Sequence, residues 1–584
     1  MKRKPITQTF LEAFQRPHQA VAIKYKLHKV WREMSWQDYF RSAEAVAQGL
    51  AHCGIKPGDT VAILSETRWE WAALDFGILG LGAITVPIYQ SNRPEEIQII
   101  IKDSEAKFLV VEDAAQVKKW LSIAKHCPTV KTVVCIDKLQ DAVSGVMAWD
   151  EWLDQGVKAM QGQPDFFATQ IGKNKMSDIA TIVYTSGTTG EPKGAVLTHT
   201  QILSEVEAIG LAFPISSDDI TLSFLPYAHV LGRIELWLHS YIGFTLAFAE
   251  GIDRLKQNLR EVQPTVMIGV PRIFEKIYAG IAAELQRHQW LKSILDTMEH
   301  RSNFLGRTFL GWPRRQLTDR LIYSKIRQGL GGRLRFAVSG GAPLDAAIGK
   351  FFYRAKVLVL EGYGLTETTA AICANTPTQF EFGTVGRPMD EVEIKIAEDG
   401  EVIVKSDKVM REYYRNPKAT QAVFKDGYFY TGDIGEWTKK GFLRITDRKK
   451  DLIKTAGGKY VAPQKLEGLF KTSPLISNVL IHGDRKKYIV ALITLNEATA
   501  QKMAKDKGWS FRDYKALTQS SEIHEMVRKI VAQINSGLGS YETIKNFAIL
   551  PQDFSIESGE LTPSLKIKRK VCDERYKALI DSLY

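Results

Sequence analysis

The sequence is poor in cysteine. Its 584 residues include five cysteines, and no two of them form a CxxC pair. They are Cys53, Cys127, Cys135, Cys373 and Cys572. An odd number of scattered cysteines suits a reducing cytosol better than a disulfide framework. We therefore expect free, mostly buried thiols in a cytoplasmic protein.

Long hydrophobic runs are also missing. The longest apolar-leaning stretch, 236–249, is interrupted by His239 and is shorter than the roughly 20 residues that a membrane-spanning helix needs. Residues 1–17 begin with basic residues but lack the apolar stretch of roughly 7 to 15 residues that signal peptides contain. We expect 236–249 to belong to the core, and we expect neither a membrane span nor export.

The marks of a nucleic-acid-binding protein are absent, although the chain is basic. The formal net charge is +12, and residues 447–584 contain 24 Lys and Arg against 16 Asp and Glu. The basic surplus therefore lies mainly in the C-terminal part. No RNP-type aromatic motif, zinc-finger spacing or long basic arm accompanies it. We expect no nucleic-acid partner, and phosphorylated small molecules or an anionic membrane fit the charge better.

Short apolar runs alternate with longer helical patterns between about residues 35 and 370. The runs lie at 61–64, 84–89, 108–112, 132–136, 181–185, 265–270, 334–341 and 357–364. Runs that are this short and rich in Val and Ile predict strands of βαβ units and mostly parallel, helix-flanked sheets. In such sheets ligands bind where strands end and loops begin.

The pattern changes after about residue 385 to short alternating strands with frequent glycine, and the residues 398–401 predict a hairpin turn. From 447 the chain becomes more charged and ends in one more α+β pattern. The sequence thus predicts an α/β N-terminal domain, 1–447, and a smaller, mobile α+β C-terminal domain, 448–584. Within the first, residues 1–384 form α/β subdomains and 385–447 a β-rich subdomain.

A loop rich in glycine and hydroxyl groups follows one apolar run. The stretch YTSGTTGEPKG spans 184–194. Glycine allows several backbone N–H groups to face one anion, while hydroxyls and a lysine add donors and charge. We expect phosphate there, bound by Thr185, Ser186, Gly187, Thr188, Thr189, Gly190 and Lys193. The loop is not a Walker loop, because Pro192 replaces its second glycine and Gly194 its magnesium-binding hydroxyl.

The same stretch resembles the phosphate loop of the adenylate-forming superfamily, which includes acyl-CoA synthetases, luciferases and the adenylation domains of peptide synthetases. Other motifs that resemble those of the family follow in the family's order over nearly the whole chain. They are PYAHVLGR (226–233), SGGAPL (339–344), EGYGLTET (361–368), YTGD (430–433), DRKKDLIKTAGGKYVAP (447–463) and LTPSLKIKRK (561–570).

The resemblance implies a nucleotide site. Its adenine pocket and catalytic loop would include Gly340, Gly341, Ala342, Glu361, Gly362, Tyr363 and Gly364, with the tyrosine ring beside the adenine. Asp433 would accept hydrogen bonds from the ribose hydroxyls, since a carboxylate can hold both protons of a vicinal diol, and Arg448 would lie near the ribose. Glu367 would hold Mg²⁺, a hard cation that prefers a carboxylate, and Thr366 would donate to the substrate phosphate.

The resemblance also implies groups around the reacting carbonyl. Lys566 would reach into the active site during adenylation, and His229 would border the reacting carboxylate as a positioning group without an acid-base role. Lys450 would be the hinge about which the C-terminal domain rotates. Gly457 and Gly458 would let that domain approach the thiol arm of coenzyme A.

Within the superfamily, the segment 319–344 resembles long-chain fatty acyl-CoA synthetases more than the acetate, aryl or amino-acid branches. Two local departures are Leu565 and Glu412, which stand where relatives have glycine. The resemblance implies an ATP-dependent ligase that makes an acyl-adenylate, releases pyrophosphate, and then forms acyl-CoA and AMP. Its partners would be a fatty acid, ATP, coenzyme A and Mg²⁺. The Phe, Trp and Leu residues of 224–248 either line an acyl tunnel or are ordinary core.

Several alternatives stay open. A fatty acyl-AMP ligase or acyl-[acyl carrier protein] synthetase would deliver the acyl group to a carrier's phosphopantetheine, and a luciferase-like oxidase would use oxygen. A non-catalytic relative would have lost Lys566, Glu367 or Lys193, and all three are present. The segment 301–317 mixes basic and aromatic residues, so we expect at most peripheral contact with the inner membrane face. A homodimer is compatible with the sequence.

Overall fold

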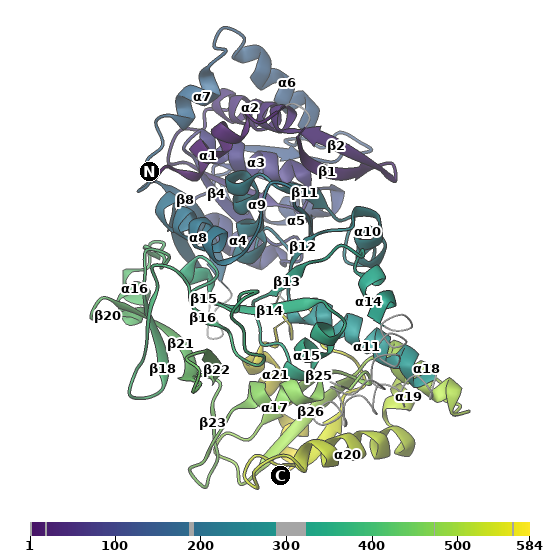
Figure 1. The fold of residues 1–584 in the computed structure, drawn as a ribbon. Coiled ribbons are helices and arrows are strands. Elements are labelled where there is room, and N and C mark those ends of the chain that lie inside the picture. The colour runs from purple at the N-terminus through teal and green to yellow at the C-terminus, as the bar shows by residue number, and fades with distance from the viewer. Residues whose placement is uncertain (1–2, 18–19, 186–191, 288–322, 472, 563–565) are drawn as a thin grey trace, which may run out of the picture.

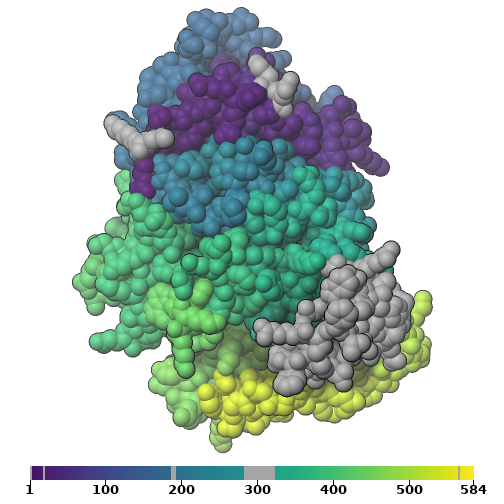
Figure 2. Space-filling model, viewed as in Figure 1, coloured from purple at the N-terminus to yellow at the C-terminus, as the bar shows by residue number. Residues whose placement is uncertain are grey.

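Figure 1 shows a computed structural model of the chain, which describes residues 3–17, 20–185, 192–287, 323–471, 473–562 and 566–584. The N-terminal elements lie at one end of the molecule and the C-terminal elements at the other. Figure 2 shows the same order on the surface, where the yellow C-terminal part packs below the teal and green central part. The mixed α/β fold confirms the predicted fold class.

The largest sheet has eight strands and is mostly parallel, as the alternating runs predict. In spatial order its strands are β19 (Glu412–Tyr413), β9 (Lys193–Thr198), β8 (Ile179–Thr185), β4 (Ile84–Ile88), β3 (Thr60–Leu64), β5 (Phe108–Val111), β6 (Thr132–Cys135) and β7 (Met147–Ala148). Every residue of β3, β4 and β5 is buried, which is typical of parallel strands covered on both faces. Two pairs depart from the parallel order: the β8–β9 hairpin, in which Thr185 pairs with Lys193, and the antiparallel pair of β9 and β19.

Two further sheets continue the α/β part. One has the order β10 (Ile220–Ser223), β11 (Thr245–Phe248), β1 (Val21–Leu27) and β2 (Val30–Ser35). The other has the order β12 (Val266–Gly269), β13 (Phe336–Ser339), β14 (Leu358–Tyr363), β15 (Cys373–Ala374) and β16 (Arg387–Pro388). Because β12, β13 and β14 are parallel, the loops after β13 and β14 leave the sheet at the same edge.

All described α-helices of this part have at least one buried residue. They are α1 (Ile6–Ala13), α2 (Trp36–His52), α3 (Trp69–Gly80), α4 (Pro94–Ser104), α5 (Ala114–Ile123), α6 (Trp149–Ala159), α7 (Phe166–Ile171), α8 (His199–Ala212), α9 (Val230–Ile242), α10 (Leu255–Val262), α11 (Pro271–Arg287), α14 (Ser324–Gly329) and α15 (Ala346–Arg354), with the short 3₁₀ helices η1 (Ala124–His126) and η3 (Thr366–Thr368). No described helix is long and apolar enough to reach across a bilayer.

Residues 236–249 belong to the core, as predicted, and form the end of α9 and the strand β11. The buried ring of His239 is 2.6 Å from Phe244 O through Nδ1, so the histidine that interrupts the apolar run has a backbone partner. All five cysteines are free; four of them are buried and Cys53 is half-buried. Both outcomes agree with the sequence.

A sheet of short antiparallel strands follows, as the change of pattern after residue 385 predicts. Its order is β17 (Glu393–Ile396), β18 (Glu401–Lys405), β21 (Tyr428–Trp437) and β20 (Phe424–Lys425), with β22 (Leu443–Arg448) paired to β21 and the helix α16 (Pro417–Val423) beside it. The turn between β17 and β18 is the predicted hairpin, with Gly400 at a φ of 85°.

The C-terminal part has its own apolar core. It consists of the hairpin β23 (Ile453–Lys454) and β24 (Tyr460–Val461), the sheet β25 (Ile476–His482), β26 (Ile489–Leu495) and β27 (Ile544–Ile549), and the helices α17 (Pro463–Phe470), α18 (Glu497–Asp506), α19 (Tyr514–Thr518), α20 (Ser521–Asn535), α21 (Arg569–Arg575) and α22 (Lys577–Ser582). Two ion pairs join it to the N-terminal part: Lys568 with Glu96 at 3.3 Å and Lys471 with Glu275 at 3.3 Å.

Candidate active site

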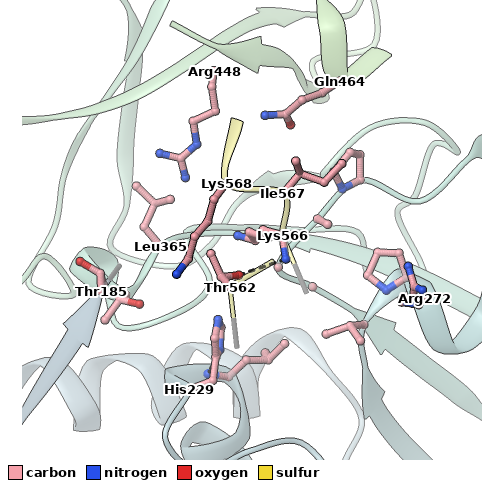
Figure 3. Close-up of a pocket in the computed structure, with 18 of the residues that line it drawn as sticks. Thr185, His229, Arg272, Leu365, Arg448, Gln464, Thr562, Lys566, Ile567 and Lys568 are labelled. Carbon is pink, nitrogen blue, oxygen red and sulfur yellow. Dashed lines mark hydrogen bonds between the residues drawn. The ribbon is translucent and has the colours of Figure 1, made fainter. Parts of the chain in front are cut away.

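A single large cleft of about 3730 Å³ lies where the sheets of the N-terminal part face the C-terminal part. The predicted site residues that line it are Thr185, Lys193, His229, Gly340, Gly341, Ala342, Glu361, Gly362, Tyr363, Gly364, Thr366, Glu367, Asp433, Arg448, Lys450 and Lys566. Motifs that are far apart in the sequence therefore converge on one cavity. Figure 3 shows Lys566 in this pocket between Arg448 and His229.

The structure describes only the two ends of the predicted phosphate loop, 184–194. Thr185 ends β8 and Lys193 begins β9, while Ser186, Gly187, Thr188, Thr189 and Gly190 lie outside the described residues. The Lys193 ammonium lies 5.3 Å from the centre of the Tyr413 ring, which fixes it by a cation–π contact. Close packing explains the glycine at position 194, because a Cβ atom there would lie 2.5 Å from Ile182 Cγ2.

A tyrosine, a carboxylate and an arginine form one group at the end of β14. The Tyr363 hydroxyl donates to Asp433 Oδ2 at 2.7 Å, and Arg448 Nε lies 2.8 Å from Asp433 Oδ1. Asp433 and Arg448 are paired across β21 and β22. Burial raises the pKa of Asp433, and the Arg448 guanidinium opposes this rise. A carboxylate has about four lone-pair sites, so Asp433 can still accept from a diol.

Glu367 is on η3, at the start of the loop after β14. Its Oε1 accepts a hydrogen bond from the Tyr413 hydroxyl at 2.9 Å, which leaves Oε2 for another partner. Among the described residues there is no cluster of three His, Cys, Asp or Glu that could enclose a metal ion. One free carboxylate oxygen nevertheless fits Mg²⁺, which usually takes one or two carboxylates and completes its shell with water and substrate phosphates.

Lys566 lines the cleft on a short turn of the C-terminal part and is exposed to the open space of the cleft. Its N–H donates to Thr562 Oγ1 at 3.0 Å, and Thr562 N–H donates to Lys566 O at 2.8 Å. Desolvation by the surrounding walls of the cleft lowers the pKa of Lys566 and Arg448 lowers it further, while Asp433 and Glu367 raise it. The ammonium thus faces two carboxylates without forming a direct ion pair with either among the described contacts.

His229 is the N-cap of α9 and is held in its neutral form. Its Nδ1 accepts the N–H of Leu231 at 3.1 Å, so the other ring nitrogen, Nε2, carries the proton and can donate. Burial and the nearby Lys566 lower the pKa of His229 to about 4. A group that stays neutral at physiological pH agrees with the expected positioning role.

Glu361 lines the cleft, but one oxygen is already occupied. Its Oε2 accepts Leu344 N–H at 2.9 Å, so the carboxyl group ties the segment 339–344 to β14. Burial raises the pKa of Glu361 to about 7. Gly364 is required by close approach, since a Cβ there would lie 1.3 Å from Ala370 O.

The predicted junction between the two domains, 447–463, has a single conformation in this structure. Lys450 is exposed and lines the cleft next to Arg448. Gly457 and Gly458 lie in the turn between β23 and β24 and do not line the cleft, so their contact with coenzyme A stays a prediction. The sequence analysis did not predict Tyr413 as a site residue. It contacts both Lys193 and Glu367, and its place in MREYYRNP (410–417), a segment that resembles the family pattern, is the signal that could have indicated it.

The fold and the cleft together define an α/β protein with a large cleft between a large and a small lobe. Family comparison agrees with this class. The model "AMP-binding enzyme" matches residues 10–414, and the model "AMP-binding enzyme C-terminal domain" matches residues 450–584. The chain belongs to the AMP-binding enzyme family.

Individual relatives are similar over nearly their whole length. A long-chain-fatty-acid–CoA ligase of Mycobacterium bovis, FadD15, is 37% identical over 95% of this chain and 93% of its own. The long chain acyl-CoA synthetase 1 of Arabidopsis thaliana is 32% identical over 94% of this chain and 87% of its own. The solved structure of the anthranilate CoA ligase AuaEII with anthranoyl-AMP has a TM-score of 0.77 at 20% identity, and the match covers 99% of this chain and 98% of that one, which shows a shared fold.

Proposed function

We propose that this protein is a long-chain fatty acid:CoA ligase (AMP-forming). It activates the acid with ATP as an acyl-adenylate, releases pyrophosphate, and then forms acyl-CoA and AMP. The observation that supports this most directly is that Lys193, Glu367, Asp433 and Lys566, which come from four separate motifs, line one cleft. The names of the relatives agree, since they are long-chain fatty acyl-CoA ligases or synthetases.

The first half-reaction needs a phosphorus electrophile beside a carboxylate nucleophile. A carboxylate oxygen of the fatty acid bonds to the α-phosphorus of ATP, and the bond from that phosphorus to the pyrophosphate oxygen breaks. Catalysis of such a displacement depends on positioning and on neutralising developing negative charge. Lys566 and Lys193 would supply fixed positive charge, and Asp433 would hold the ribose. Mg²⁺, held through the free oxygen of Glu367, would supply further charge neutralisation.

The second half-reaction uses the same carbonyl in different surroundings. The sulfur of coenzyme A bonds to the acyl carbon, and the bond from that carbon to the AMP oxygen breaks. Lys566 is no longer needed at the phosphate, so we propose that the domain 448–584 rotates about Lys450 and brings Gly457 and Gly458 to the cleft. The ion pairs Lys568–Glu96 and Lys471–Glu275 would hold the arrangement described here until then.

The substrate class follows from the relatives and from the apolar side of the cleft. Phe224, Leu231, Phe248 and Val270 line it beside His229, which would donate through Nε2 to the acid or its adenylate. We further propose a cytoplasmic protein with at most peripheral membrane contact, either monomeric or a homodimer. The basic and aromatic segment 301–317, on which the membrane prediction depends, lies outside the described residues.

A panel of C2 to C20 acids, measured by ATP-dependent pyrophosphate release, tests the proposal. The rate should rise from the short to the long acids, and AMP should be released in proportion to acyl-CoA when free coenzyme A is added. The same assay with a carrier protein in place of coenzyme A distinguishes the ligase from an acyl-[acyl carrier protein] synthetase. Pyrophosphate release with thioester formed only on the carrier would replace the ligase assignment by an acyl-[acyl carrier protein] synthetase.

A further inference from the structure

A fully buried ion pair lies next to the turn that follows Glu367. Lys408 Nζ and Glu205 Oε2 are 2.8 Å apart, and neither side chain is exposed. Glu205 is on α8, the helix that follows β9, and β9 begins with Lys193. Lys408 lies in the loop between β18 and β19. Neither residue lines the cleft, and neither belongs to a motif that predicts a site.

The ion pair holds one residue of that turn from both sides. Ala371 N–H donates to Glu205 Oε1 at 2.7 Å, and Lys408 Nζ donates to Ala371 O at 3.0 Å. In addition, the Thr369 hydroxyl donates to Lys408 O at 2.7 Å. Each charged group is thus compensated both by its partner and by the backbone of 369–371, which is the condition for burying charge in a protein interior.

The turn that the pair holds has an unfavourable backbone conformation. Thr369 and Ala370 have φ values of 56° and 93°, in the left-handed region that side chains with a Cβ rarely adopt. Two such residues in succession persist only where the surroundings determine the backbone. Ala370 N–H returns to Leu365 O at 3.1 Å, so the shape of the turn also fixes the loop that carries η3.

The segment that begins at Lys408 reaches Glu367 from the other direction. Met410 N–H donates to Glu367 O at 2.7 Å, and the Tyr413 hydroxyl donates to Glu367 Oε1 at 2.9 Å. Glu367 therefore lies between the turn 369–371 and the segment 410–413. The ion pair connects both of them to α8.

We propose that the Lys408–Glu205 ion pair positions the Glu367 carboxylate for adenylation, and that placement rather than stability is its role. The inference rests on the proposed function. Replacing a buried ion pair by apolar residues of similar volume is often neutral or stabilising, so stability alone does not account for the pair. Neither residue contacts substrate; both act through the turn and through Tyr413. A misplacement of about 1 Å can lower a rate by about 100-fold.

The test compares two half-reactions in Glu205→Met/Lys408→Met and in Glu205→Gln. The first is pyrophosphate release from ATP and a C16 acid; the second is thioester formation from supplied acyl-adenylate and coenzyme A. The double variant should fold with a lower unfolding midpoint, because it leaves no unpaired buried charge but removes the side-chain partners of Ala371 N–H and Ala371 O. Its adenylation kcat should fall by about 10- to 100-fold, while the second rate stays within about twofold. Glu205→Gln keeps the acceptor for Ala371 N–H, so its loss should be smaller if the variant folds.

Asp219→Asn is the matched control. Asp219 is a buried carboxylate 2.7 Å from Arg335, and neither residue lines the cleft. This change should lower the unfolding midpoint without altering the ratio of the two rates. Because the ratio is taken within one preparation, partial folding does not disturb it. Equal losses in both half-reactions of the double variant, or full adenylation activity, would overturn the inference. A wild-type protein without either activity would refute the proposed function, and this inference with it.

Discussion

The carboxylate of Asp433 offers a direct test of the nucleotide site. Asp433 receives the Tyr363 hydroxyl on one oxygen and lies against Arg448 with the other. Asp433→Asn keeps the shape of the side chain and one acceptor oxygen. The substitution removes the negative charge. It also replaces one acceptor oxygen by an NH₂ group, which then faces a donor, either the Tyr363 hydroxyl or the Arg448 guanidinium. We therefore expect weaker binding of AMP and ATP.

The size of the effect follows from the bonds that are lost. A hydrogen bond to a charged group contributes about 1.5–3 kcal/mol, so the loss of one bond to the ribose should weaken AMP binding by about 10- to 100-fold. Arg448 also loses its partner. Its side chain keeps 38% of its surface exposed, so water can replace part of that interaction, and the free energy of unfolding should fall by only about 1–2 kcal/mol.

Calorimetric titration with AMP measures this change. Glu393→Gln is the matched control, because the Tyr428 hydroxyl donates to Glu393 at 2.6 Å and Lys395 lies 3.1 Å from the same carboxylate, but both charged side chains are exposed and lie outside the cleft. Its AMP affinity should equal that of the wild type. An unchanged affinity in Asp433→Asn would refute the ribose assignment, and an equal loss in both variants would point to damage to the whole sheet.

Two further outcomes follow from charged groups that line the cleft. Lys566→Met should lower pyrophosphate release by about 100- to 1000-fold, because a fixed charge at the developing anion is lost, and should leave thioester formation from supplied acyl-adenylate within about threefold; parallel losses would contradict this role. Burial raises the pKa of Glu361 from about 4.5 in the unfolded chain to about 7, so the folded state holds the proton more tightly, and the contribution of this group to stability falls as pH rises through that window. Urea unfolding between pH 4.5 and 7 measures this. The free energy of unfolding of Glu361→Gln, relative to that of the wild type, should increase by up to about 3 kcal/mol over this range. If the two plots of unfolding free energy against pH stay parallel, Glu361 is not the group responsible.

Local patterns in the sequence were sufficient for much of the fold. The apolar runs at 61–64 and 108–112 form the buried strands β3 and β5, since short Val- and Ile-rich runs can be satisfied only inside a covered sheet. The hairpin at 398–401 follows from its turn residues. The approach of Asp433 to Arg448 is also local in origin, because their strands are neighbours along the chain and in the sheet.

Contacts between distant segments could not be predicted in this way. The bond from Tyr413 to Glu367 joins residues 46 positions apart, and the Lys568–Glu96 pair joins residues 472 positions apart. No periodicity within a segment encodes such a partner. The buried Lys408 is a second example, since a lysine in a charged loop predicts a solvated side chain, and the carboxylate that compensates it, Glu205, lies on α8.

The antiparallel return of β9 along β8 has a consequence for how this enzyme controls its chemistry. In a strand–loop–helix phosphate site, the helix that follows the loop lends a permanent positive field to the anion. Here the next helix among the described residues, α8, begins at His199, after the end of β9. If phosphate binds here as proposed, its positive surroundings would come from side chains, and one of them, Lys566, belongs to the C-terminal part. In the proposed mechanism, the positive charge around the phosphates is therefore complete only while Lys566 of the C-terminal part faces the cleft, and rotation of that part would remove it.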